Sequence, residues 1–152
     1  MEFIQFIDRV EIEIIRLVEK AGYSIEENGA LCLLNKDYVG FMKKSKKTII
    51  ICTDNAKKRE GYHLFRKINN DKFDRVALHI KKALRHEAVH VTQECNDGNL
   101  LDINEKLTIN PAKIRALKGS TKISGEIEKE RQAYILEDKA KLLKKKIERY
   151  CL

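Results

Sequence analysis

The sequence lacks tryptophan and contains one proline and seven glycines among its 152 residues. Scarce proline and glycine favour long helices and argue against an all-β fold, which needs many turns. No apolar run approaches the length of a membrane span, so no transmembrane segment is expected. A chain of this length is sufficient for one hydrophobic core, and we expect a single domain over residues 1–152.

The cysteines are few, and none forms a CxxC pair: they are Cys32, Cys52, Cys95 and Cys151. The N-terminal segment is acidic and polar residues interrupt its apolar positions, which is unlike a secretory signal. Together these features predict a cytoplasmic protein, in the host cytoplasm if the chain is phage-encoded, with all thiols reduced.

The net charge is +8, and the basic excess lies beyond the acidic first thirty residues. Residues 139–149 hold six bases around Leu142, Leu143 and Ile147, a pattern that nucleic acid or an anionic membrane could attract. No aromatic platform or recognised nucleic-acid motif accompanies them. We therefore expect a solvated helix docked by its apolar residues, and neither nucleic acid nor a membrane as partner.

Apolar spacing predicts an α+β fold. Helical periodicity covers residues 3–20 and 71–94, a short helix should begin at Pro111, and a long last helix should run from about residue 124 to Tyr150. Three runs rich in apolar and β-branched residues predict strands, namely Ala30–Leu34, Tyr38–Met42 and Thr48–Cys52. Their short connections predict an antiparallel three-stranded sheet. Residues 54–70 are expected to form a loop with at most one short turn.

The strongest chemical signal is the HExxH pattern made by His86, Glu87 and His90. Four-residue spacing places the two imidazoles on adjacent turns of one helix face, from which both can reach one zinc ion. Glu87 then lies beside the metal, where it can act as the general base that takes a proton from a zinc-bound water. The motif falls inside an expected helix with mostly uncharged flanks, as a buried active-site helix requires.

A catalytic zinc also needs a third protein ligand. The last expected helix offers four acids, Glu126, Glu128, Glu130 and Glu137, and we predict Glu130 because Ala133 follows it in an ExxA pattern that lets two helices pack closely. Glu126 and Glu137 fall on nearly the same helix face and stay open as alternatives.

His86–His90 with Glu130–Ala133 resembles the gluzincin metallopeptidases, and the fragments HEAVHVTQ and EKERQAY are most similar to small bacterial and phage members and to mitochondrial and ImmA/IrrE-type peptidases. The resemblance implies a zincin-like fold, a zinc cofactor and a peptide or protein substrate. Such a substrate would add as a strand along the sheet, with Thr48–Cys52 at its edge. Many gluzincins carry Asp four residues after the glutamate ligand to orient a histidine. Tyr134 occupies that position here, and could support a ligand, stabilise an oxyanion or only pack.

Other candidates have weaker arguments. His79 lies about 10 Å along the helix from His86 and is expected to be structural. His63 precedes the helix and is expected at the surface, although it could bind substrate. Gln93 could hydrogen-bond around the site or simply end the helix. Cys95 is turned away from His90 and is not expected to be a ligand.

The main prediction is a zinc metallopeptidase. Two alternatives stay open: a zincin-like protein that binds metal or a partner without turnover, and a basic nucleic-acid-binding accessory protein. Iron, cobalt or manganese could also occupy a His–His–Glu site. Substrate identity, endo- or exo-cleavage and oligomeric state do not follow from the residues.

Overall fold

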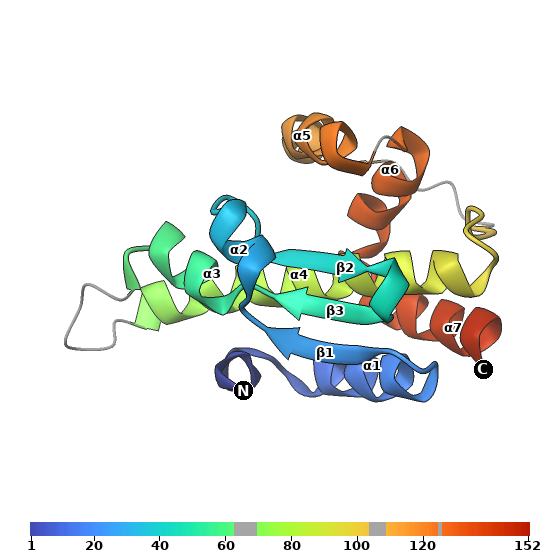
Figure 1. The fold of residues 1–152 in the computed structure, drawn as a ribbon, viewed down its shortest axis with the longest axis horizontal. Coiled ribbons are helices and arrows are strands. Elements are labelled where there is room, and N and C mark those ends of the chain that lie inside the picture. The colour runs from blue at the N-terminus through green and yellow to red at the C-terminus, as the bar shows by residue number, and fades with distance from the viewer. Residues whose placement is uncertain (63–69, 104–108, 125) are drawn as a thin grey trace.

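The computed structural model describes residues 1–62, 70–103, 109–124 and 126–152, and of these the side chains of residues 120 and 122–124 are not described. The fold is α+β, with three short strands and a majority of helix (Figure 1). In chain order its elements are η1 Glu2–Phe6, α1 Arg9–Lys20, β1 Ser24–Glu27, α2 Ala30–Leu34, β2 Gly40–Lys43, η2 Lys44–Lys46, β3 Thr48–Ile51, α3 Thr53–Arg59, α4 Asn70–Cys95, η4 Pro111–Lys113, α5 Ile114–Ser124, α6 Ile127–Leu136 and α7 Ala140–Cys151.

Helix α4 forms the centre of the molecule, and α1, α6, α7 and the sheet pack around it (Figure 1). Its buried apolar residues recur at helical spacing, as in Val76, Ile80, Leu84, Ala88 and Val91. Burial on several sides explains why so long a helix is stable, since packing of an apolar face contributes most of a helix's stability in proteins. The predicted helix over residues 71–94 is confirmed.

The sheet is mixed, with strand order β1-β3-β2. β3 is central, pairing parallel with β1 and antiparallel with β2, with Ser24 opposite Thr48 and Gly40 opposite Ile51. All four β3 residues are buried, because both faces of the sheet are covered there. Ile49 and Ile51 join the main core around α4, whereas Ile50 packs with residues of α2 on the other face.

The prediction of an antiparallel meander is therefore wrong in two respects. Ala30–Leu34 is the helix α2 rather than a strand, and only Cys32 among its residues is buried, while Leu33 and Leu34 are exposed. The missing strand is β1, Ser24–Glu27, whose alternation is hard to recognise because Ile25 is its single apolar residue. The strands near residues 38–42 and 48–52 are confirmed, but β3 lies in the middle of the sheet and β2 at its edge.

Two further predictions about helices need correction. Residues 54–70 were expected to be mainly loop, yet α3 occupies Thr53–Arg59. The single last helix is two helices, α6 and α7, because Lys139 leaves the helical region of backbone space at φ −123° and ψ 62°. The predicted start at Pro111 is confirmed, since the Asn110 side chain accepts a hydrogen bond from the Ala112 amide at 3.0 Å.

The expectation of reduced thiols is wrong in this structure, in which all four cysteines are paired. Cys32 is bonded to Cys52, which fastens α2 to the end of β3, and Cys95 is bonded to Cys151, which joins the ends of α4 and α7. Disulfides persist mainly in oxidising environments. The cytoplasmic placement, which was predicted together with reduced thiols, stays a prediction that the disulfides do not support.

The basic C-terminal segment is partly used inside the fold. Lys144 pairs with Glu13 of α1, and the buried Lys146 donates to the Asp102 carbonyl at 2.5 Å. Leu143 and Ile147 are fully buried against the core, so the helix is docked by its apolar residues as expected. Within the described residues, no helix combines the length and apolar character needed to cross a membrane.

Candidate metal centre

The two histidines of the HExxH pattern project from the same face of α4. The Nε2 atoms of His86 and His90 are 3.3 Å apart. His86 is 8% exposed and His90 is half-buried, so both rings lie at the floor of a recess. The four-residue spacing predicted this juxtaposition, and the helix supplies it without any unusual backbone geometry.

The third member of the cluster is Glu130 from α6. Its Oε2 lies 3.1 Å from His86 Nε2 and its Oε1 lies 3.0 Å from His90 Nε2. Within the described residues, these three side chains form the one group of histidine, cysteine or acidic residues whose ligand atoms could hold a metal, all within 4.8 Å of one another. Glu126 and Glu128 instead pair on the surface with Lys129 and Arg131.

Each histidine is oriented through its other ring nitrogen. His90 Nδ1 lies 2.8 Å from Gln93 Oε1, and His86 Nδ1 lies 3.3 Å from Glu137 Oε2. If Nδ1 of each ring donates to these oxygens, loss of the Nε2 proton would leave the Nε2 lone pairs pointing at the shared space, the tautomer that metal-binding histidines adopt. Gln93 therefore does hydrogen-bond within the site, which was one of its two predicted roles.

The donor set fits a zinc ion. Tetrahedral ligands at bonds of 2.0–2.1 Å lie roughly 3.3 Å apart, close to the separation of the two Nε2 atoms. Two neutral imidazoles and one carboxylate are also the protein ligands of many catalytic zinc sites, which keep a fourth position open.

Glu137 was considered as an alternative third ligand, but it contacts the back of His86 instead. It thereby makes the contact with a candidate ligand histidine that the gluzincin resemblance implied for the position four residues after Glu130. Tyr134, which occupies that position, packs edge-on against the His86 ring at 4.5 Å and donates its hydroxyl to the Ala116 carbonyl at 3.3 Å. Glu137 follows Glu130 by seven residues, which places both on the same helix face. This spacing was the sequence feature from which a position of Glu137 near the cluster could be predicted.

Glu87 is 8% exposed and lines the same recess as the histidines. Burial raises the pKa of its carboxyl group above the ordinary value. The close approach of β2 shapes this position, since a Cβ on Gly40 would lie 3.2 Å from both Glu87 Cγ and Ala83 Cβ. A larger residue at that point of the strand would have to displace Glu87 or Ala83 slightly, a constraint that sequence analysis missed.

The charges of the cluster are strongly coupled. Burial opposes a charged His86, but hydrogen bonds to Glu130 and Glu137 outweigh it and raise the pKa of His86 to about 10. Burial likewise opposes ionisation of Glu130, yet its hydrogen bonds to His86 and His90 hold its pKa well below the usual range. In the absence of metal, a proton on His86 neutralises part of this acidic cluster, and a metal cation would replace it.

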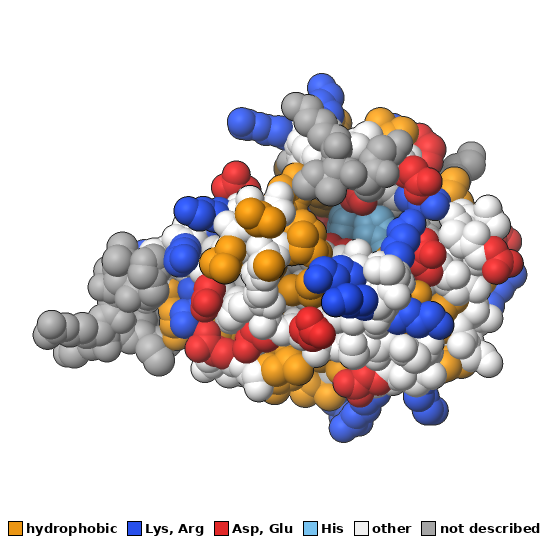
Figure 2. Space-filling view, viewed as in Figure 1, with side chains coloured by type: hydrophobic (Ala, Val, Ile, Leu, Met, Phe, Trp, Pro, Cys, Tyr) orange, Lys and Arg blue, Asp and Glu red, His pale blue; other side chains and the backbone are white. Residues whose placement is uncertain are grey.

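The cluster opens into a cleft of about 360 Å³. Figure 2 shows the histidine surface at the bottom of a hollow, with hydrophobic side chains on one side and basic ones on another. The sheet-side wall comes from β2 and the residues just before it, including Tyr38, Phe41 and Met42, and Lys44 and Lys129 also line the cleft. The strand next to the cleft is therefore β2, not Thr48–Cys52 as predicted.

The remaining candidates lie elsewhere. His79 is bonded to Glu60 through Nε2 at 2.9 Å, in agreement with a structural role. Cys95 is in a disulfide and is not a ligand. His63 lies outside the described residues.

A protein-family model described as "Domain of unknown function (DUF8637)" matches residues 3–152. No curated protein and no solved structure matches the chain.

Proposed function

The chain belongs to the DUF8637 family, and from its site we propose that it is a zinc-dependent hydrolase, a metallopeptidase with a compact zincin-like fold. The observation that carries this proposal is the convergence of the two Nε2 atoms and the Glu130 carboxylate beside a buried Glu87 in one open cleft. Metal ligands without other polar groups are typical of structural metal sites. An acid that is not itself a ligand, next to a metal that substrate can reach, is typical of hydrolytic sites.

His86, His90 and Glu130 would hold the metal. A zinc ion there would polarise a carbonyl and lower the pKa of a water molecule. Glu87 would accept the proton of the attacking water and deliver it to the leaving amine nitrogen. The raised pKa of Glu87 suits the first step, because a more basic carboxylate accepts a proton from water more readily than an ordinary one.

The substrate class follows from the wall beside the metal cluster. β2 has a strand neighbour on one side only, β3, among the described residues. An extended peptide can therefore add to its other side by main-chain hydrogen bonds, with its side chains alternating between the cleft and solvent. The aromatic and methionine side chains of Tyr38, Phe41 and Met42 would favour apolar groups there.

The test has two parts. Elemental analysis should find about one zinc per chain in the wild-type protein and none in His86→Ala or Glu130→Ala. His79→Ala is the matched control, because His79 lies on the same helix but bonds Glu60, and it should keep the metal.

The second part is cleavage of a mixed peptide library, followed by mass spectrometry. Glu87→Gln should retain zinc and lose cleavage. A wild-type protein that binds stoichiometric zinc but cleaves nothing would favour the non-catalytic metal-binding alternative. Absence of zinc after reconstitution would overturn the proposal altogether.

A further inference from the structure

Lys113 is a buried lysine close to the metal cluster, and the HExxH pattern does not account for it. It is 9% exposed, and its Nζ donates to Glu137 Oε1 at 2.5 Å, Asp138 Oδ2 at 2.7 Å and the Tyr134 carbonyl at 3.3 Å. Three acceptors satisfy all three ammonium hydrogens. A buried charge persists only when it is paired in this way, so its position is tightly specified.

The carboxylate of Glu137 is shared between Lys113 and a metal-ligand candidate. One oxygen accepts from Lys113, and the other lies 3.3 Å from His86 Nδ1. All three side chains are buried. A continuous chain of polar contacts therefore runs from η4 through α6 and its end to the imidazole on α4.

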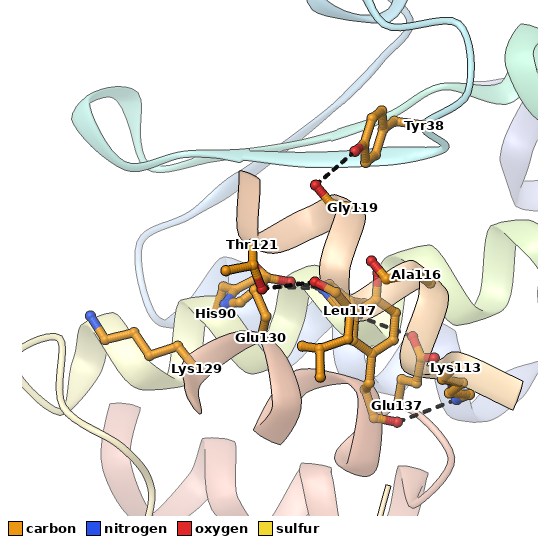
Figure 3. A network of polar contacts seen from close by, with 12 residues as sticks. Tyr38, His90, Lys113, Ala116, Leu117, Gly119, Thr121, Lys129, Glu130 and Glu137 are labelled. Carbon is orange, nitrogen blue, oxygen red and sulfur yellow. Dashed lines mark hydrogen bonds and ion pairs between the residues drawn. The ribbon is translucent and has the colours of Figure 1, made fainter. Parts of the chain in front are cut away.

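Lys113 also lies near the start of a segment, Pro111–Ser124, that contacts both α6 and the loop before β2. On the α6 side, the Tyr134 hydroxyl donates to the Ala116 carbonyl. On the sheet side, the Tyr38 hydroxyl donates to the Gly119 carbonyl at 3.4 Å. Figure 3 shows Lys113 beside Glu137 and, further along the same segment, Gly119 facing Tyr38. Because Tyr38 lines the cleft, the segment joins α6 to one wall of the cleft.

We propose that Lys113 is a positioning residue that couples the docking of segment 111–124 to occupancy of the metal site. This rests on the proposed zinc centre but goes beyond it. A metal held by His86 would fix the imidazole ring and, through it, the Glu137 carboxylate, which in turn holds Lys113 of that segment. Coupling of this kind is reciprocal, so a docked segment must also strengthen metal binding.

The experiment measures both directions of this coupling. Zinc affinity is determined by competition with a chromophoric chelator, and amide hydrogen exchange of residues 111–124 is followed with and without zinc. In the wild-type protein zinc should slow that exchange. Lys113→Met should weaken zinc about tenfold, the range of orienting groups behind a ligand, and zinc should no longer protect the segment. Lys113→Arg, which keeps the charge, should restore part of both effects.

Lys146→Met is the matched control, because Lys146 is also a buried lysine but donates to the Asp102 carbonyl. It should bind zinc like the wild-type protein. Glu137→Gln provides a second route if Lys113→Met does not fold, and it should abolish the zinc-dependent protection as well. In the Glu137→Gln background, Lys113→Met should weaken zinc little further, since both changes break one chain.

The coupling would be overturned if Lys113→Met bound zinc as tightly as the wild-type protein and zinc still slowed hydrogen exchange of residues 111–124. If only Glu137→Gln folds, the same result in that variant would overturn it. Either result would leave the hydrolase proposal intact. Conversely, a protein with the expected coupling but no peptide cleavage would overturn the hydrolase and support the coupling.

Discussion

Zinc binding should release a proton from His86, and this makes the affinity for zinc depend on pH over an unusual range. The pKa of His86 is raised to about 10 in the metal-free protein, and a ligating imidazole must be neutral. At pH 7 removal of that proton opposes binding by about 4 kcal/mol, at about 1.4 kcal/mol per pH unit. Affinity should therefore rise about tenfold per pH unit up to about pH 10.

The informative interval lies between about pH 8 and about pH 9, where an ordinary imidazole with a pKa near 6.5 is already neutral. Chelator competition at both pH values, corrected for the chelator's own titration, gives the slope. Glu137→Gln removes one of the hydrogen bonds that raise the pKa of His86, so its slope should flatten at a lower pH. An affinity that is equal at the two pH values would refute the reasoning.

The raised pKa of His86 also makes the stability of the metal-free protein depend on pH. Because the folded pKa of His86 is above its unfolded value, its proton stabilises the metal-free fold fully below about pH 6.5. That stabilisation is lost as pH rises towards about 10. The melting temperature of the metal-free protein should therefore have a component that falls over this interval, and zinc should remove it.

Three further predictions concern the groups around the cluster. Gln93→Leu should weaken zinc about 10–100-fold by releasing His90, measured by chelator competition, whereas an unchanged affinity would contradict its orienting role. Gly40→Ala should lower the free energy of unfolding in urea by about 1–3 kcal/mol. It should also impair peptide cleavage without loss of zinc. Unaltered stability would show that β2 can shift to make room for the added methyl group. Replacing Cys95 and Cys151 together by serine should cost about 2–4 kcal/mol in the same assay, and free thiols in the unreduced, denatured wild-type protein would disprove the pairing.

The sequence predicted the local part of the site well, because helical spacing alone determines where His86 and His90 lie relative to each other. Glu130 could also be predicted, since a small residue three positions later allows close helix packing. Glu137 was left open as an alternative third ligand, and the contact that it makes is with His86 Nδ1 rather than with the shared space between the Nε2 atoms. Its contact with His86 depends on how α6 ends and on Lys113, which lies far away in the sequence.

The sheet was harder to predict for a similar reason. β1 contains one apolar residue and gains its partners from β3, twenty-four positions further along the chain. Ala30–Leu34 has the composition of a strand, yet it folds as a helix, and the partner that fastens it through a disulfide is Cys52, which local propensity cannot indicate. The constraint at Gly40 could not be predicted from the sequence either. The space for a side chain at this position is restricted only because β2 packs against α4.

The position of β2 at the sheet margin also bears on how readily the chain would pair with copies of itself. An open strand edge attracts other copies of the same chain as readily as it attracts a peptide, and proteins limit this risk with short edge strands and lysines. β2 is four residues long, ends at Lys43 and continues directly into Lys44 and Lys46. Two such edges aligned in parallel would bring Lys43 and Lys46 of one copy beside those of the other, and the like charges would oppose that pairing, although Lys44 is paired with Glu94 at 2.9 Å. A short strand that ends in lysines is thus a poor template for pairing with copies of itself, while its main-chain groups would still serve the peptide binding proposed above.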